Sequence, residues 1–256
     1  MTLHDSIFLF GAALAAGALN SVAGGGGFIA FPALIFTGVP PIQANATNTV
    51  ALWPGTVAST GAYRRAISPE ARRMLGPMIL SGIAGGIIGA WLLLHTPQKT
   101  FLGMVPWMLL SATVLFLFSR PLVRWFHERT SGWKHNGRVA KFAPALLQLP
   151  IAIYIGYFGA GAGMMVMAML ALMGIKNIHT LNGVKTLLVS VCNGVAIITF
   201  VIAHAVMWPQ ALLMVVAAAI GGYGGAHYAQ KMTESSVRAI ATATGLAMSI
   251  YFFLRR

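Results

Sequence analysis

The 256-residue chain contains very little negative charge and only one cysteine. Asp and Glu together number 4, and charged residues make up 8% of the chain, against roughly 25% in an ordinary soluble domain. Hydrophobic residues make up 57%. The single cysteine, Cys192, rules out an intrachain disulfide or a cysteine metal cluster and fits a small core residue. This composition argues against a soluble single domain.

The basic residues are numerous but unevenly placed. Lys and Arg number 17 and give a formal net charge of +13, which by itself would suggest nucleic-acid binding. Most of them, however, lie in two tracts, Arg64–Arg73 and Arg120–Lys141, while long apolar runs separate the others. Runs of about 18 residues or more are typical of membrane-spanning helices. The chain is therefore predicted to be a polytopic membrane protein that binds no nucleic acid.

The N-terminus resembles a signal peptide in its apolar run, Ile7–Leu19. Its first residues carry Asp5 and no Lys or Arg, however, so the run is predicted to be a retained first helix. A four-glycine run and a short apolar piece, Phe28–Thr37, follow it. As a helix this piece covers about 15 Å, half of a bilayer core. Longer segments then follow at Ala46–Ala62, Met74–Leu94 and Phe101–Phe118.

The second half repeats the order of the first. A shift of 136 residues places glycines on glycines at both the break and the helix that follows: Gly25 on Gly161, Gly27 on Gly163, Gly38 on Gly174, and Gly85, Gly86 and Gly89 on Gly221, Gly222 and Gly225. With one more residue, Asn45 and Thr49 fall on Asn182 and Thr186. A constant offset over about 70 residues indicates an internal duplication.

The charge bias changes side between the two repeats. Both basic tracts of the first half fall on one side, which the positive-inside rule makes cytoplasmic. In the second half the position matching the first tract, Ala205–Pro209, has no Lys or Arg, and Lys231 and Arg238 lie on the other side. Inverted-topology repeats are therefore expected, with Arg255 and Arg256 as the exception. Five crossings per repeat, or three crossings plus a re-entrant hairpin, both fit.

The predicted fold class is an all-α polytopic membrane protein. It has two inverted-topology repeats of about five hydrophobic segments each, 8 to 10 helices in total, with Gly-rich broken or re-entrant helices. We expect an N-terminal transmembrane repeat at 1–119, a basic cytoplasmic linker at 120–141 and a C-terminal transmembrane repeat at 142–256.

The glycines fall into two kinds. Gly82, Gly85, Gly86 and Gly89 recur at helical spacing, which favours close helix packing in lipid. Gly25, Gly26 and Gly27, with Gly161 and Gly163 in the second repeat, instead predict breaks in helices. Helices that restart at Phe28 and Met164 would point free N–H groups into a cavity and attract an anion there. A tight helix crossing is the structural alternative.

Polar residues cluster after each break. The first cluster contains Asn45, Thr47 and Asn48, and the second contains Asn182 and Lys185. Polar groups inside a membrane are costly unless paired, so the clusters mark interhelical bonding or a substrate path. The Lys185 ammonium requires an anionic partner or water, although a lysine that snorkels to the interface is the competing interpretation.

The apolar spans contain no carboxylate. Asp5, Glu70, Glu128 and Glu234 all fall in loops or near segment ends, which argues against a cation pump and suits an anion. His204 and His227 could carry protons, but packing or interfacial positions are expected for both. The sequence offers no paired nucleophile and base and no metal spacing, so neither an enzyme nor a cofactor is predicted.

At these residues the chain resembles the TauE/SafE family, the sulfite exporters of bacterial membranes. The resemblance is strongest over Gly17–Thr49, where the glycine run, Pro32, Gly38-Val39-Pro40 and Ala44-Asn45-Ala46-Thr47 look like the family's first-repeat signature. The second repeat keeps Gly159, Gly161, Gly163, Gly174 and Asn182 but replaces the Ala-x-x-Thr portion. The resemblance implies a multi-pass transporter of the bacterial cytoplasmic (inner) membrane for sulfite, organosulfonates or related sulfur oxyanions, without ATP-binding motifs.

The leading hypothesis is a secondary transporter, an exporter or permease, that carries a small anion by alternating access between the two repeats. The glycine breaks would supply N–H donors, the asparagines hydrogen bonds and Lys185 a positive charge. A non-transporting scaffold or assembly subunit and an intramembrane enzyme are the alternatives. The lipid bilayer and the anion are the expected partners, and the sequence leaves a homodimer open.

Overall fold

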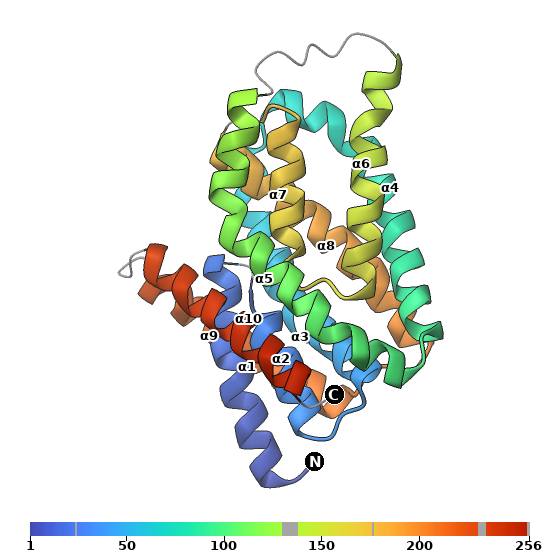
Figure 1. The fold of residues 1–256 in the computed structure, drawn as a ribbon, viewed down its shortest axis with the longest axis vertical. Helices are drawn as coiled ribbons and strands as arrows, with labels where there is room; N and C mark the ends of the chain where they lie inside the picture. Colours follow the sequence, from blue (N-terminus) through green and yellow to red (C-terminus); the bar gives the residue numbers. More distant parts are fainter. Residues whose placement is uncertain (24, 130–137, 176, 230–233, 255–256) are drawn as a thin grey trace.

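The computed structural model describes residues 1–23, 25–129, 138–175, 177–229 and 234–254. Within these ranges the chain forms ten α-helices, one 3₁₀ helix and no strands, which confirms the predicted all-α class (Figure 1). The elements are α1 (Leu3–Ala23), α2 (Gly27–Phe36), α3 (Pro41–Tyr63), η1 (Arg64–Ala66), α4 (Pro69–His95), α5 (Gln98–Arg129), α6 (Arg138–Tyr157), α7 (Ala162–Leu172), α8 (Ile178–Ile202), α9 (Trp208–Ala229) and α10 (Glu234–Leu254). Helix α5 continues into the predicted linker, and α6 begins within it.

The short helices α2 and α7 belong to re-entrant hairpins. Helix α1 begins at the lower end of Figure 1 and stops near the middle of the molecule, and α2 then returns to the lower end. Hairpin α6–α7 does the same from the upper end. Both α2 and α7 end at glycines with positive φ, Gly38 (+82°) and Gly174 (+83°), which terminate a helix with little strain. Of the two topologies open from sequence, the structure therefore has three crossings plus a hairpin per repeat.

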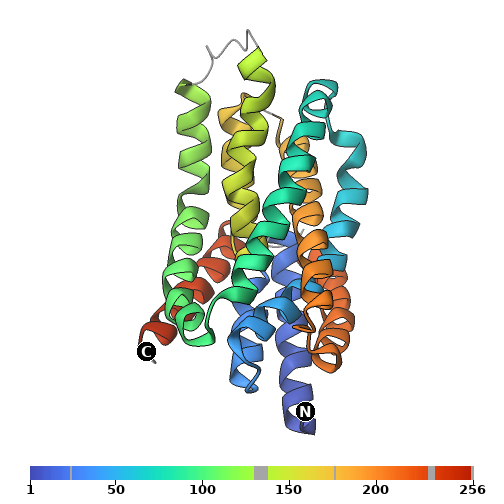
Figure 2. The ribbon, with the colours of Figure 1, turned by 90° about the vertical axis from the view of Figure 1, so that its right-hand side faces the viewer.

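Corresponding helices of the two repeats run in opposite directions. Helix α3 runs upwards and α8 downwards, and α4 runs downwards and α9 upwards (Figures 1 and 2). The packing follows the same rule, because α4 packs on α6 just as its counterpart α9 packs on α1. Helices α3 and α8 pack against each other at the centre, where the Trp53 indole N–H donates to the Ser190 carbonyl over 2.9 Å. The architecture is that of two inverted repeats.

The glycines that recur at helical spacing in α4 and α9 lie at close contacts between helices, as their spacing predicts. A Cβ built on Gly85 would lie 2.5 Å from the Ala152 Cβ on α6, and one on Gly89 would overlap the Ile153 carbonyl oxygen. In the other repeat, a Cβ on Gly221 would overlap the Leu14 carbonyl oxygen on α1. Only glycine allows these backbones to approach so closely, which confirms the packing interpretation.

Hydrogen bonds identify the elements that meet at each end. At the lower end the Gln98 side chain accepts from the Ile42 N–H (2.9 Å) and donates to Gln43 (2.7 Å), so the α4–α5 turn lies beside the start of α3. At the upper end the Thr180 hydroxyl donates to the Ala66 carbonyl over 2.7 Å. The basic tract Arg64–Arg73 therefore lies at the opposite end from the α4–α5 turn, as the charge pattern predicts.

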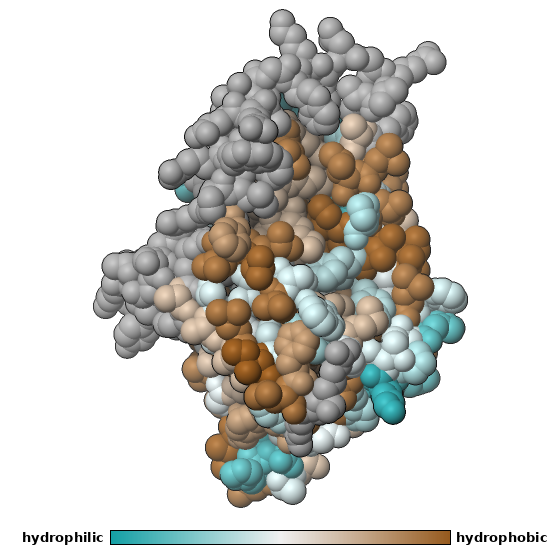
Figure 3. Space-filling view, in the orientation of Figure 1, coloured by the Kyte–Doolittle hydropathy of each residue, from teal (hydrophilic) through white to brown (hydrophobic). Residues whose placement is uncertain are grey.

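The exterior fits a bilayer. Large apolar side chains are exposed along α4, α5 and α9, and hydrophobic residues cover much of the face drawn in Figure 3. By length and composition, α1, α4 and α8 each contain a stretch able to cross a membrane. All four acidic residues fall in the first or last turn of a helix, outside the apolar centres of the spans. The chain is a multi-pass membrane protein.

Candidate substrate cavity

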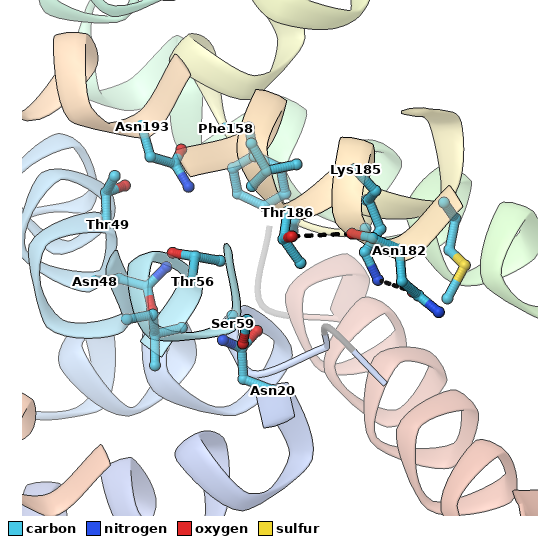
Figure 4. A pocket seen from close by; sticks show the side chains of 18 of the residues that line it. Asn20, Asn48, Thr49, Thr56, Ser59, Phe158, Asn182, Lys185, Thr186 and Asn193 are labelled. Carbon is cyan, nitrogen blue, oxygen red and sulfur yellow. Dashed lines mark hydrogen bonds between the residues drawn. The ribbon is translucent and has the colours of Figure 1, made fainter. Parts of the chain in front are cut away.

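A cavity of about 190 Å³ lies between α3 and α8, beside the tips of the two hairpins (Figure 4). The two hairpin tips lie close together beside the cavity, since a Cβ at Gly27 would lie 3.9 Å from the Ala160 Cβ. Its wall continues along α3 to Tyr63, directly before η1, so the cavity extends toward the upper end. A cavity of this size with polar walls can hold a small solute and water.

Part of the cavity wall consists of positions that the duplication relates. Positions on α3 are matched by positions on α8 that are 137 residues further along the chain. The matched pairs in the wall are Asn48 and Lys185, Thr49 and Thr186, Leu52 and Val189, and Thr56 and Asn193. Gly27 and Gly163, at the starts of α2 and α7, form another pair. The cavity therefore lies on the pseudo-twofold axis between the repeats.

Lys185 is the only charged side chain among the described residues that line the cavity. Its Nζ donates to the Asn182 Oδ1 over 2.8 Å, and its stem crosses the start of α7, where a Cβ at Gly163 would lie 3.3 Å from Cδ. Asn177 positions these residues, because its side chain caps α8 by accepting from the N–H groups of His179 and Thr180. An ammonium has three donors, so Lys185 can also donate to a bound anion.

Asn48 on α3 occupies the position equivalent to Lys185 on α8, and both line the cavity. The Asn48 side chain is 7% exposed, and its Oδ1 is buried without a hydrogen-bond partner among the described residues. A buried amide oxygen without a partner is costly, so a solute or water that donates to it is favoured. Asn20 on α1, Ser59 on α3 and Asn193 on α8 supply further neutral polar groups (Figure 4).

The hairpin breaks differ in detail from the sequence expectation. Gly159 and Gly161 have φ of +73° and +71°, so this tip requires glycine. The N–H groups of Phe28 and Met164 are not free, since they donate to the carbonyls of Gly25 and Gly161 over 3.0 Å. Helix ends commonly tighten in this way and use some of their unpaired N–H groups. The positive ends of the α2 and α7 dipoles still lie at the cavity.

The cavity wall includes six of the ten predicted site residues: Gly27, Asn48, Gly161, Gly163, Asn182 and Lys185. Gly25 and Gly26 are buried behind it, where a Cβ on Gly26 would lie 2.6 Å from the Ala16 carbonyl oxygen. Asn45 and Thr47 lie on its lower side. The Asn45 Nδ2 donates to the Tyr157 carbonyl (3.1 Å), and the Thr47 hydroxyl accepts from the Met207 N–H (3.0 Å).

Packed aromatic rings close the lower side of the cavity. Phe158 lines the cavity and contacts Phe31 edge-on, with 5.6 Å between ring centroids. Phe31 also contacts Phe101 and Phe252 at 6.3 and 6.2 Å. The described structure therefore has its cavity continuing toward the upper end and sealed toward the lower end.

Of the two histidines considered from the sequence, the structure describes the side chain of one, His204, which does not line the cavity. His204 is exposed at the end of α8 with φ of +53°, and the side chain of His227 lies outside the described residues. Among the described residues, no group of three or more His, Cys, Asp or Glu side chains could hold a metal ion. Sequence reasoning missed Thr56, Ser59 and Asn193 as site residues, although Thr56 and Asn193 occupy duplicated positions two helical turns after Thr49 and Thr186.

Comparisons with known proteins agree with this architecture. Residues 9–252 match the profile of the family described as Sulfite exporter TauE/SafE. A probable membrane transporter protein, ORF9, of Sinorhizobium sp. is 29% identical over 252 residues, covering 98% of this chain and 93% of its own. A probable membrane transporter protein of Haemophilus influenzae is 24% identical over 94% of this chain and 91% of its own, and YfcA of Escherichia coli K12 is 24% identical over 94% and 87%.

No solved structure matches the chain significantly. The family and the relatives are membrane transporters rather than enzymes. The match covers nearly the whole chain, including both hairpins and both polar clusters. The chain belongs to the TauE/SafE family of membrane transporters.

Proposed function

We propose that this transporter carries a small anion across the bacterial cytoplasmic membrane through the cavity between α3 and α8. The substrate class is sulfite, an organosulfonate or a related sulfur oxyanion, as the family description suggests. The observation that carries the proposal is the wall itself: Lys185 is the only charged group among its described residues, and two helix N-termini lie beside it. A positive, acid-free wall inside a membrane favours an anion and disfavours a cation.

Each part of the wall has a defined role in this proposal. The Lys185 ammonium supplies charge, Asn48 and Asn182 supply directed hydrogen bonds, and Gly163 lets the substrate approach the α7 backbone. Rocking of one repeat against the other closes the upper side and opens the lower side. With the basic tract Arg64–Arg73 placed in the cytoplasm, the present arrangement faces inward.

Binding to the purified protein tests the proposal. Sulfite, sulfate, methanesulfonate, taurine, acetate and chloride are titrated at fixed ionic strength, with binding measured by calorimetry. We expect a sulfur oxyanion or a sulfonate to bind more tightly than acetate or chloride. Binding of none of them, or equal weak binding of all six, contradicts it.

A further inference from the structure

Two repeat-equivalent asparagines, Asn45 on α3 and Asn182 on α8, occupy different settings in this structure. Asn45 is 1% exposed and bonds across the repeats, from its Nδ2 to the carbonyl of Tyr157 at the end of α6. That carbonyl belongs to the last turn of a helix, where carbonyls lack helical partners. Asn182 instead lines the cavity and accepts from Lys185 on its own helix. The duplication thus gives one asparagine that joins the repeats and one that does not.

The cavity shows the same asymmetry along its length. Ser59 and Tyr63 line its upper part, on α3. Their equivalents on α8, 137 residues later, are Ala196 and Phe200, and both are fully buried at 0% exposure. The upper half of the pathway is therefore present, while its inverted counterpart at the lower end is filled by packed side chains.

A second cross-repeat bond strengthens the closed lower end. The hydroxyl of Thr47, itself 0% exposed, accepts from the Met207 N–H in the α8–α9 connection. The equivalent of Thr47 on α8 is Val184, which has no hydroxyl. The equivalent position on α8 therefore cannot form this particular bond at the upper end.

From this asymmetry we propose that Asn45 and Asn182 are alternating latches between the repeats. This proposal rests on the proposed transport function. In the present state Asn45 holds hairpin α6–α7 and keeps the lower end closed. When the repeats exchange conformations, Asn45 releases Tyr157, and Asn182 donates to the equivalent carbonyl on α1, at position 21.

The contact between Lys185 and Asn182 links the latch to the substrate. In this structure the Asn182 oxygen accepts from Lys185 over 2.8 Å. A bound anion is a stronger partner for an ammonium than a neutral amide is, so it competes for Lys185 and releases Asn182. Closure of the upper end is thereby coupled to occupancy of the site. The buried Asn45 Oδ1, which has no partner among the described residues, keeps the lower latch weak enough to open.

Cysteine accessibility tests the latches in membranes. In a Cys192→Ala background, Ser59→Cys reports on the upper pathway and Ala196→Cys on the lower pathway, each through its rate of reaction with maleimide. Asn45→Ala should raise reaction at position 196 and lower it at position 59, by roughly threefold to tenfold for the loss of one hydrogen bond. Asn182→Ala should have the opposite sign: because it removes the bond of the alternative state, it should raise reaction at position 59 and lower it at position 196, and sulfite should no longer slow the reaction at position 59.

The controls separate the latch from a general loosening and from the transport function. Thr60→Ala removes a hydroxyl that bonds only within α3, so neither reporter should change. If Ala196→Cys does not fold, the two opposite responses at position 59 decide. Equal responses to Asn45→Ala and Asn182→Ala, or no response, would overturn the latch even if the protein transports anions. Opposite shifts measured without substrate would support the latch even if no sulfur anion bound.

Discussion

Lys185 combines a charge with a restricted setting, between Asn182 and the first turn of α7. Lys185→Gln removes the charge and keeps a side chain of similar length. Anion affinity should fall by roughly tenfold to a hundredfold, the range for a lost hydrogen bond to a charged group. Lys185→Arg should restore part of it, because guanidinium keeps the charge but changes the donor geometry. Calorimetric titration measures each variant.

Lys99 provides the matched control for Lys185. It is an exposed lysine at the start of α5, remote from the cavity-lining residues. Lys99→Gln changes net charge by the same amount and should leave affinity unaltered. An equal loss in both variants would mean that the overall positive charge, rather than Lys185, attracts the anion.

The cavity glycines can be tested without disturbing the fold. Gly161 is unsuitable, because its positive φ and the nearby Ala112, 2.7 Å from a built Cβ, make any side chain disruptive. Gly163→Ala places a methyl group 3.3 Å from the Lys185 Cδ, so Lys185 must shift and affinity should fall by roughly threefold. Gly27→Ala meets its neighbours at 3.6 and 3.9 Å and should be neutral in the same titration. Similar affinities for both variants would exclude the predicted displacement of Lys185.

The duplication made part of the cavity wall predictable from sequence. Asn182 and Lys185 were found because a polar cluster follows each break, and both line the cavity. Asn45 and Thr47 belong to the matching cluster but contact the opposite repeat. The helical period shows which residues share a face of α3. Which of those faces points to the cavity depends on the helices packed around α3, and the sequence alone does not specify that packing. The sequence likewise does not show that, of Gly25, Gly26 and Gly27, only Gly27 lines the cavity.

At the scale of helices, small residues hold the two repeats together. Helix α9 presents Gly221 to the α1 backbone, while Gly224 on the same helix has no atom within 4 Å of a built Cβ. Gly221→Ala should destabilise the protein by about 1–3 kcal/mol through forced helix separation. Gly224→Ala should stabilise it by up to about 1 kcal/mol, because alanine favours a helix. Unfolding in detergent measures both, and equal effects would contradict the close α1–α9 contact.

The re-entrant hairpins show where sequence reasoning reached its limit. Glycine runs and the Gly38-Val39-Pro40-Pro41 stop marked both ends of α2, and the structure places its end at Phe36. A helix of 10 residues is too short to cross a bilayer, yet length alone did not show that it turns back. Its direction depends on packing against α1 and α3, which the sequence pattern does not contain.

The distribution of basic residues predicts how the whole molecule is oriented in the membrane. The positive-inside rule places Ser68 in the cytoplasm and the α4–α5 turn outside. Cysteines at Ser68 should react with an impermeant maleimide only from the cytoplasm, and those at Thr96 and Met207 only from outside. The structure puts Thr96 and Met207 at the same end, so they must agree. Opposite labelling of these two positions would contradict the inverted architecture.

Flux through the intact protein shows whether a sulfur anion crosses the membrane through the cavity between α3 and α8. Proteoliposomes are loaded with unlabelled sulfite or methanesulfonate, and uptake of the labelled anion from outside is followed over time. We expect saturable exchange that is strongly reduced by Lys185→Gln and retained in Lys99→Gln. Exchange no faster than in protein-free liposomes, or exchange unchanged by Lys185→Gln, would contradict a sulfur-anion pathway through the cavity between α3 and α8.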